Sequence, residues 1–167
     1  MANRLTSLGK GFPGKPSHPP LTDASIGAYT VGVAMLVLGA LGVEEEQMAH
    51  GALLAIGGGL ALALPTALTG LLDWLALPKG TPTKTVATTH LITMLAATVV
   101  FALTFIAHLD GYDDGEVEAL PLILGLVAES LLADEDEAES ATPESSATPA
   151  PKPPNLWPSP PWIRLNV

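Results

Sequence analysis

Two histidines and two aspartates stand where apolar segments begin or end, and they are the residues best placed to do chemistry. His18 and Asp23 come before or at the start of one apolar segment, Asp73 ends the next, and His90 lies near the start of a third. Successive helices of a membrane bundle run in opposite directions, so we expect these four side chains to meet at one depth near one membrane face. We call them the predicted polar cluster.

The other two histidines are expected near the opposite face, because His50 begins the second apolar segment and His108 ends the third. His90 and His108 are 18 residues apart, which is about five turns of helix and roughly 27 Å of rise. Imidazoles that share a depth can serve as axial ligands of a b-type haem. One hypothesis is therefore a haem b site that uses His90, with His18 or His108 as its partner and His50 as a further candidate.

Two other interpretations of the predicted polar cluster stay open. Ionisable side chains inside a membrane are costly and commonly functional, which favours a proton or solute pathway through Asp73 and His90. Alternatively, His90 pairs with Asp73 and simply locks the helices together, since buried polar groups usually find partners. For His50 and His108, an ordinary interfacial position is the simplest interpretation.

The sequence offers no catalytic constellation, and we expect no enzyme and no metal site. It contains no cysteine, which excludes disulfides, thiolate metal sites and a cysteine nucleophile. Ser25 and Ser130 have no base at a matching spacing, and residues 57–59 (Gly-Gly-Gly) lie inside an apolar segment rather than in a phosphate-binding loop. Nucleic acid is excluded as a partner, because seven Lys and Arg face 17 Asp and Glu and phosphates need a basic surface.

Three uncharged runs must position the candidate residues, and they cover residues 24–43, 47–72 and 85–109. Each is long enough to cross a bilayer as a helix, which takes roughly 20 apolar residues. A fourth, shorter apolar run contains Glu129, and we expect this side chain to reach the cytoplasmic surface from the last turns of its helix. The predicted fold is all-α, an integral membrane four-helix bundle over residues 23–133. Its helices are expected at residues 23–43, 47–77, 84–109 and 116–133.

The segments outside the bundle predict its orientation and its contacts. Residues 1–22 form a polar arm with three basic residues and no acid, and the turn at residues 78–84 carries two lysines. Because Lys and Arg mark cytoplasmic loops, we expect a multi-pass protein of the prokaryotic cytoplasmic membrane with both termini in the cytoplasm. Residues 134–167 are an acidic and then proline-rich tail that cannot fold alone. Four apolar side chains near its end either contact the membrane interface or dock on a partner protein: Trp157, Trp162, Ile163 and Leu165.

Two motifs and one histidine carry a resemblance to a known family. Residues 14–29 read Gly-Lys-Pro-Ser-His-Pro-Pro-Leu-Thr-Asp-Ala-Ser-Ile-Gly-Ala-Tyr, and residues 64–74 read Leu-Pro-Thr-Ala-Leu-Thr-Gly-Leu-Leu-Asp-Trp. Together with His90, they resemble an uncharacterised bacterial membrane family, catalogued as a domain of unknown function with four membrane helices and a Gly-His-Pro-x-His-Pro signature. The resemblance spans residues 12–130.

The resemblance also shapes the expected function. Lys15 replaces the first signature histidine, and residues 127–132 read Val-Ala-Glu-Ser-Leu-Leu where the family often has a Gly-Gly-His-Leu-like segment. Some relatives are joined to Rieske-type iron–sulfur domains, which implies membrane electron transfer and, for this chain, a separate protein partner. We therefore expect a non-catalytic accessory subunit of a larger membrane assembly, of a redox kind. A small b-type haem protein using His90 is the alternative, and the proton or solute pathway ranks third.

Overall fold

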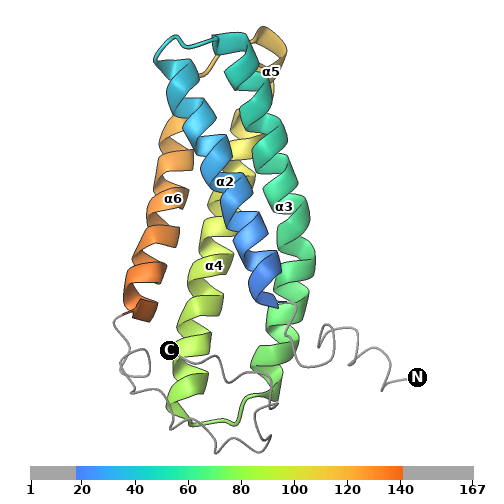
Figure 1. Ribbon diagram of the computed structural model, residues 1–167, viewed down its shortest axis with the longest axis vertical. Helices are drawn as coiled ribbons and strands as arrows, with labels where there is room; N and C mark the ends of the chain where they lie inside the picture. The colour runs from blue at the N-terminus through green and yellow to red at the C-terminus, as the bar shows by residue number, and fades with distance from the viewer. Residues whose placement is uncertain (1–17, 141–167) are drawn as a thin grey trace, which may run out of the picture.

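The structure, a computed structural model, describes residues 18–140, and within that range all regular secondary structure is helical. Four long helices run antiparallel along one axis, and a short helix lies across one end (Figure 1). This confirms the predicted all-α fold. The helices are α2 (His18–Ala40), α3 (Glu45–Ala76), α4 (Pro82–Ala107), α5 (Leu109–Asp114) and α6 (Ala119–Ser140).

The first long helix begins earlier than expected. α2 starts at His18, whereas the sequence analysis expected a polar arm up to residue 22. Pro19 and Pro20 occupy its first turn, where backbone N–H groups have no acceptor inside the helix, so proline costs no hydrogen bond there. The helix ends at Ala40, and the chain turns through Gly42 and Glu44, which both adopt positive φ angles of 80° and 43°. His18 is therefore a helix residue rather than part of a polar arm.

The connection between α3 and α4 is closed by a helix cap. Thr81 lies at the N-cap of α4, and its hydroxyl oxygen accepts a hydrogen bond from the Lys84 backbone N–H at 3.2 Å. Pro82 follows at the first helical position, which suits its fixed φ angle. This places the start of α4 at Pro82, two residues before the expected boundary.

The two ends of the last helix also differ from expectation. Residues 110–115 were expected to be a turn between helices, but most of them belong to the short helix α5, which stops at Gly115 with a φ angle of 72°. α6 then runs from Ala119 to Ser140, so it starts after the expected residue 116 and continues through the acidic stretch that was assigned to the tail. Ala and Glu are strong helix formers, which accounts for the extension.

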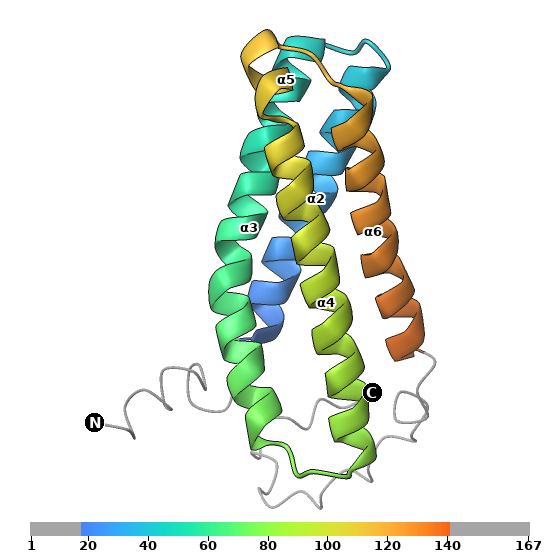
Figure 2. The same cartoon turned by 180° about the vertical axis from the view of Figure 1, so that it is seen from behind.

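The bundle core is built from large side chains of some helices placed against glycines of others. α2 packs along α3, and α4 packs along α6, as both views show (Figure 2). Across the bundle, the rings of Tyr29 and Phe101 stack with centroids 3.9 Å apart. A β-carbon added at Gly32 would lie 2.6 Å from the side chain of Ile56. Gly32 is thus a point of close backbone approach between α2 and α3.

Within residues 18–140, three helices are long and apolar enough to cross a membrane, namely α2, α3 and α4. In the most apolar window of α4, only 17 % of the residues are buried inside the bundle, so most of its surface is left for lipid or other helices. α6 is not among the three, because every 18-residue stretch of it includes Glu129 and the acids at residues 134–136.

Candidate functional site

His18 is anchored on the surface of α3 near the end where α3 and α4 connect. Its Nδ1–H donates to the Thr66 carbonyl at 3.1 Å and lies 3.4 Å from the Thr69 hydroxyl. Gly70 makes room for the ring, since a β-carbon there would lie 2.6 Å from the His18 Cε1 atom. Because Nδ1 is the donor to a carbonyl, the neutral ring has its lone pair on Nε2.

His90 of α4 faces the same ring. The centroids of the His18 and His90 imidazoles are 6.4 Å apart, and the two planes are nearly perpendicular at 87°. Both side chains are half-buried. We call these two residues the His18–His90 pair, and it brings together the first residue of α2 and a residue eight positions into α4.

A buried hydroxyl pair lies one to two turns from the His18–His90 pair, toward the middle of the bundle. Ser25 and Thr66 are both buried, and their hydroxyl oxygens are 3.5 Å apart. Each hydroxyl also donates to the carbonyl four residues earlier in its own helix. Such back-bonding satisfies a hydroxyl in a helix, so this pair is polar packing rather than a reactive group.

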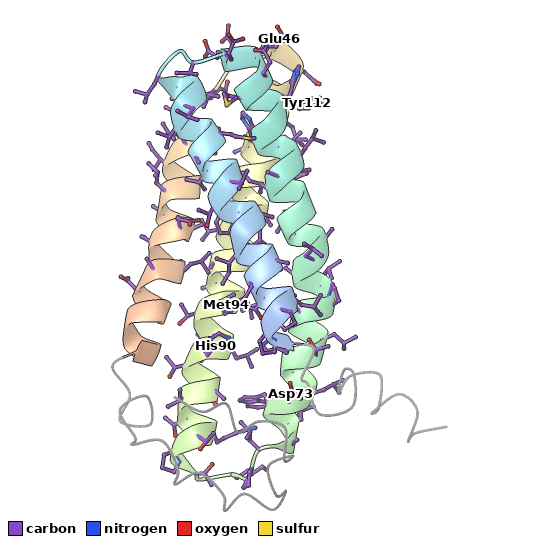
Figure 3. The ribbon with its side chains drawn as sticks, in the orientation of Figure 1. Glu46, Asp73, His90, Met94 and Tyr112 are labelled. Atoms are coloured by element: carbon purple, nitrogen blue, oxygen red, sulfur yellow. The ribbon has the colours of Figure 1, made fainter. Side chains whose placement is uncertain are left out.

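The two predicted aspartates are placed differently from the histidines. Asp23 and Asp73 are exposed, and Asp73 lies nearer to the α3–α4 connection than His90 does (Figure 3). In residues 18–140, no group of three or more His, Asp or Glu side chains is arranged to hold a metal ion. The predicted polar cluster is thus represented by the His18–His90 pair, with the two carboxylates at its periphery.

Trp74 and Lys84 hold the α3–α4 end together. The Trp74 indole N–H donates to the Thr88 hydroxyl at 3.0 Å. The Lys84 ammonium lies 3.3 Å from the centroid of the Trp74 ring and also donates to the Trp74 carbonyl. A cation over an indole face is attractive, so these contacts tie the two helix ends across their connecting turn.

The other two histidines are at the opposite end of the bundle, beside α5. His50 donates from Nε2 to the Tyr112 carbonyl at 2.9 Å, and the two rings lie 4.6 Å apart. His108 is fully buried and donates from Nε2 to the Ala49 carbonyl at 3.0 Å. Its Nδ1 is buried with no hydrogen-bond partner among the described residues. These contacts join α5 and the end of α4 to the start of α3.

Electrostatics at this end follow from burial. Burial lowers the pKa of the His108 imidazole, while its hydrogen bond to the Ala49 carbonyl and the charge of Glu118 act in the opposite direction. The ring lies just past the end of α4, roughly 27 Å of helical rise from His90. His108 and His90 are therefore too far apart to share one ligand, and His18 is the histidine that lies near His90.

One polar contact was missed by the sequence analysis. The Thr30 hydroxyl of α2 donates to Oε1 of Glu129 in α6 at 2.6 Å. Glu129 was expected in the last turns of its helix, but α6 continues for 11 residues beyond it. The sequence does contain a signal for this contact: Glu129 is the one ionisable residue between Ala119 and Ala133, so it needs a polar partner there. The predicted docking residues Trp157, Trp162, Ile163 and Leu165 lie outside the described residues.

Comparison with known proteins gives one result. No curated protein and no solved structure matches the chain. A family model described as "Predicted membrane protein (DUF2231)" matches residues 14–133. This range includes the His18–His90 pair, the Trp74 contacts and Glu129, and it agrees with the resemblance found in the sequence.

Proposed function

This chain belongs to the DUF2231 family of predicted membrane proteins, and from that premise we propose that it is a non-catalytic accessory subunit of a larger membrane assembly. A redox or electron-transfer assembly is the kind that the family resemblance suggests. In this proposal α2, α3, α4 and α6 all cross the bilayer. The observation that carries the proposal is the shape and composition of the α3–α4 end.

The α3–α4 end projects beyond the other two long helices (Figures 1 and 2). α3 continues for six residues past Gly70, where His18 contacts it, and α4 begins eight residues before His90. These lengths correspond to roughly 9 and 12 Å of helical rise. The projecting part therefore has two helices where the rest of the bundle has four.

Exposed leucines on this projection supply a surface for a partner. Leu72 and Leu75 are 45 % and 61 % exposed. The charged residues of the same projection belong at the polar surface of a membrane, so these leucines lie at a level where lipid tails do not cover them. Apolar side chains interspersed with charges are covered best by another protein, whose polar groups can pair with those charges. The charged residues in question are Asp73, Lys79 and Lys84.

The same proposal assigns an orientation and a second docking element. Lys and Arg concentrate in the N-terminal arm and in the α3–α4 turn, which favours a cytoplasmic location for both. Four spans then return the C-terminus to the cytoplasm of a prokaryotic cell. Near that terminus, Trp157, Trp162, Ile163 and Leu165 are aromatic and apolar anchors for the partner.

Site-specific photo-crosslinking in native membranes tests the proposal. A benzoylphenylalanine residue is introduced at Leu75, and a matched one at Leu54, which is 68 % exposed near the other end of α3. We expect a discrete protein adduct from position 75 and lipid adducts from position 54. Deletion of residues 150–167 is expected to reduce the yield of the same adduct while leaving thermal unfolding of the bundle unchanged.

Two outcomes would count against the proposal. Only lipid adducts from both positions would show that the projection faces the bilayer alone. An adduct pattern that is the same from positions 54 and 75 would show that crosslinking reports crowding in the membrane rather than a docking surface.

A second candidate function is a small b-type haem carrier, and the geometry of the His18–His90 pair favours it. Two axial imidazoles about 2 Å from one metal ion place their ring centroids roughly 6 Å apart. In the structure the two rings meet edge to face with their centroids 6.4 Å apart. The hydrogen bond from His18 Nδ1 to a backbone carbonyl is of the kind that orients a ligating histidine. These two residues would hold the haem, which would supply one-electron chemistry.

An absorption spectrum of the protein purified from native membranes tests this candidate. A haem protein of this design shows a Soret band that is lost in both His18→Ala and His90→Ala and is retained in His50→Ala, because His50 lies at the far end of the bundle. A colourless wild-type protein that also fails to bind added haemin excludes it.

A further inference from the structure

Glu129 is the one carboxyl in the central turns of the bundle. No other Asp, Glu, Lys, Arg or His occurs between Ala119 and Ala133 of its own helix. The same holds for residues 24–40 of α2, residues 51–72 of α3 and residues 91–107 of α4. No basic side chain of these segments can therefore neutralise the Glu129 carboxylate.

The depth of Glu129 follows from helix lengths. It lies ten residues after the start of α6 and five before Asp134, which is roughly 15 and 7.5 Å of rise. Its partner Thr30 lies seven residues after Asp23 and ten before the end of α2, or roughly 10 and 15 Å. In a hydrocarbon core about 30 Å thick, both helices place this contact inside the membrane, nearer to the α3–α4 end.

The carboxyl is held at the seam between α2 and α6. Thr30 is exposed on the outer surface of α2, and its hydroxyl donates to Oε1 of Glu129 at 2.6 Å. Oε2 of the same carboxyl is buried with no hydrogen-bond partner among the described residues. In a neutral carboxyl, Oε1 is then the carbonyl oxygen and Oε2 carries the proton. Either form leaves Oε2 buried without a partner among the described residues, and the cost is larger for a charged carboxylate oxygen than for a neutral O–H.

The elements packed against α6 are α4 and α2. α4 contributes no ionisable side chain between His90 and His108, and α2 contributes one between Asp23 and its end, the phenol of Tyr29. The Tyr29 hydroxyl is buried, and the side chain that interacts with it is that of Thr98 in α4. The surroundings of Glu129 are thus hydroxyl-bearing and apolar rather than charged.

We propose that Glu129 is a proton-binding site inside the membrane and that the Thr30 hydroxyl holds its carboxyl in place. An isolated carboxyl in hydrocarbon is stable as the neutral acid and is costly as an anion, so proton uptake and release are its available chemistry. The site is separate from the His18–His90 pair and does not depend on a partner protein or a haem. It rests on the four-span topology that belongs to the proposed function, and the two tests fail separately, because labelling reports on Glu129 whereas crosslinking reports on the α3–α4 end.

Labelling with dicyclohexylcarbodiimide tests the proposal on the full chain in phosphatidylcholine vesicles. This lipid-soluble reagent adds the O–H of a carboxylic acid across one C=N bond: the acid oxygen bonds to carbon and the proton moves to nitrogen. A carboxylate without its proton is not labelled. Mass spectrometry of the peptide that contains Glu129 should show an adduct whose yield falls as pH rises.

Substitutions distinguish labelling at Glu129 from general reactivity of the protein with the carbodiimide. Glu129→Gln is expected to abolish the adduct, and Thr30→Val is expected to shift the pH dependence because it removes the hydrogen bond to Oε1. Ser130→Ala is the matched control, since Ser130 donates only within its own helix, to the Val127 carbonyl, and its labelling curve should equal that of the wild type.

Several results would overturn the proposal. Absence of the Glu129 adduct at every pH, or a yield that does not depend on pH, shows that no proton is bound there. Protection by sodium at constant pH shows a sodium site instead of a proton site. A Thr30→Val curve that coincides with the Ser130→Ala curve removes Thr30 from the assignment.

Discussion

The ring of Tyr29 lies so close to the backbone of Gly59 that a β-carbon added at Gly59 would be 2.6 Å from two ring atoms. This contact joins α2 to α3 beside the stacked rings of Tyr29 and Phe101. Close approach of this kind, rather than a hydrophobic driving force, holds helices together in lipid.

We therefore expect Gly59→Ala to destabilise the bundle, by about 1–3 kcal/mol, as overpacking in a core does. Thermal unfolding in detergent micelles measures this. Gly58→Ala is the matched control, because a β-carbon at Gly58 would meet nothing within 4 Å and alanine favours a helix. Equal unfolding temperatures for the two variants would contradict the close packing of Tyr29 on Gly59.

The buried Tyr29 hydroxyl leads to a prediction of opposite sign. The Thr98 side chain interacts with this hydroxyl, but no hydrogen bond of ordinary geometry reaches it among the described residues, so Tyr29→Phe should leave stability unchanged or raise it by up to about 1 kcal/mol. Phe101→Ala should cost about 3–5 kcal/mol, since it removes the stacked ring and opens a cavity. Chemical denaturation of the purified protein compares the two variants. A large loss in Tyr29→Phe would reveal a hydrogen bond of the phenol.

Acid should loosen the end of the bundle that carries α5. The folded protein holds the pKa of His108 below its ordinary value of 6.5, so the unfolded chain binds more protons as pH falls through that range. Stability therefore falls on acidification below about pH 6.5 and is unaffected by this group at higher pH. Unfolding temperatures measured from pH 8 to pH 5 report the effect.

Two variants separate His108 from other titrating groups. His108→Gln keeps an amide donor for the Ala49 carbonyl but cannot titrate, so the fall in stability toward pH 5 should become smaller. His50→Gln, at the same end of the bundle, should keep the slope of the wild type. An unaltered slope in His108→Gln would assign the acid sensitivity to another group.

The cap of α4 predicts a local effect. Thr81→Ala removes the hydroxyl that accepts from the Lys84 N–H, and loss of such a cap costs about 0.5–2 kcal/mol. Hydrogen exchange of the first amides of α4 should rise in this variant. Thr83→Ala, two residues later and exposed, serves as the comparison and should leave those amides unchanged; equal exchange in both variants would argue against the cap.

Hydropathy and helix period predicted the all-α fold, because uncharged runs of this length have few other stable conformations in a membrane. The helix boundaries were harder to predict from the sequence. Pro19 and Pro20 can mark a break between elements, but they are equally compatible with the first turn of a helix. The acidic stretch after Ala133 was assigned to the tail by its charge, whereas its helix-forming residues continue α6.

The depth of a side chain in the membrane could be predicted from the sequence. The direction in which it points around the helix axis could not. His18 and Asp23 are five residues apart, which separates their directions by about 140° around the helix. The two residues therefore lie at similar depths, within about two helical turns of each other, yet only His18 faces Gly70 and His90. Glu129 illustrates the same limit, since its contact with Thr30 depends on which face of α6 meets α2.

The composition of α6 bears on how the protein is made. As a lone segment leaving the translocation machinery, a helix with a carboxyl in its apolar part and acids at its end partitions poorly into lipid. α2, α3 and α4 are each long and apolar enough to cross a membrane, and α2 offers α6 a surface that includes Thr30. Insertion of α6 as the proposed fourth span is thus expected to be a late step of biogenesis that depends on the first three helices.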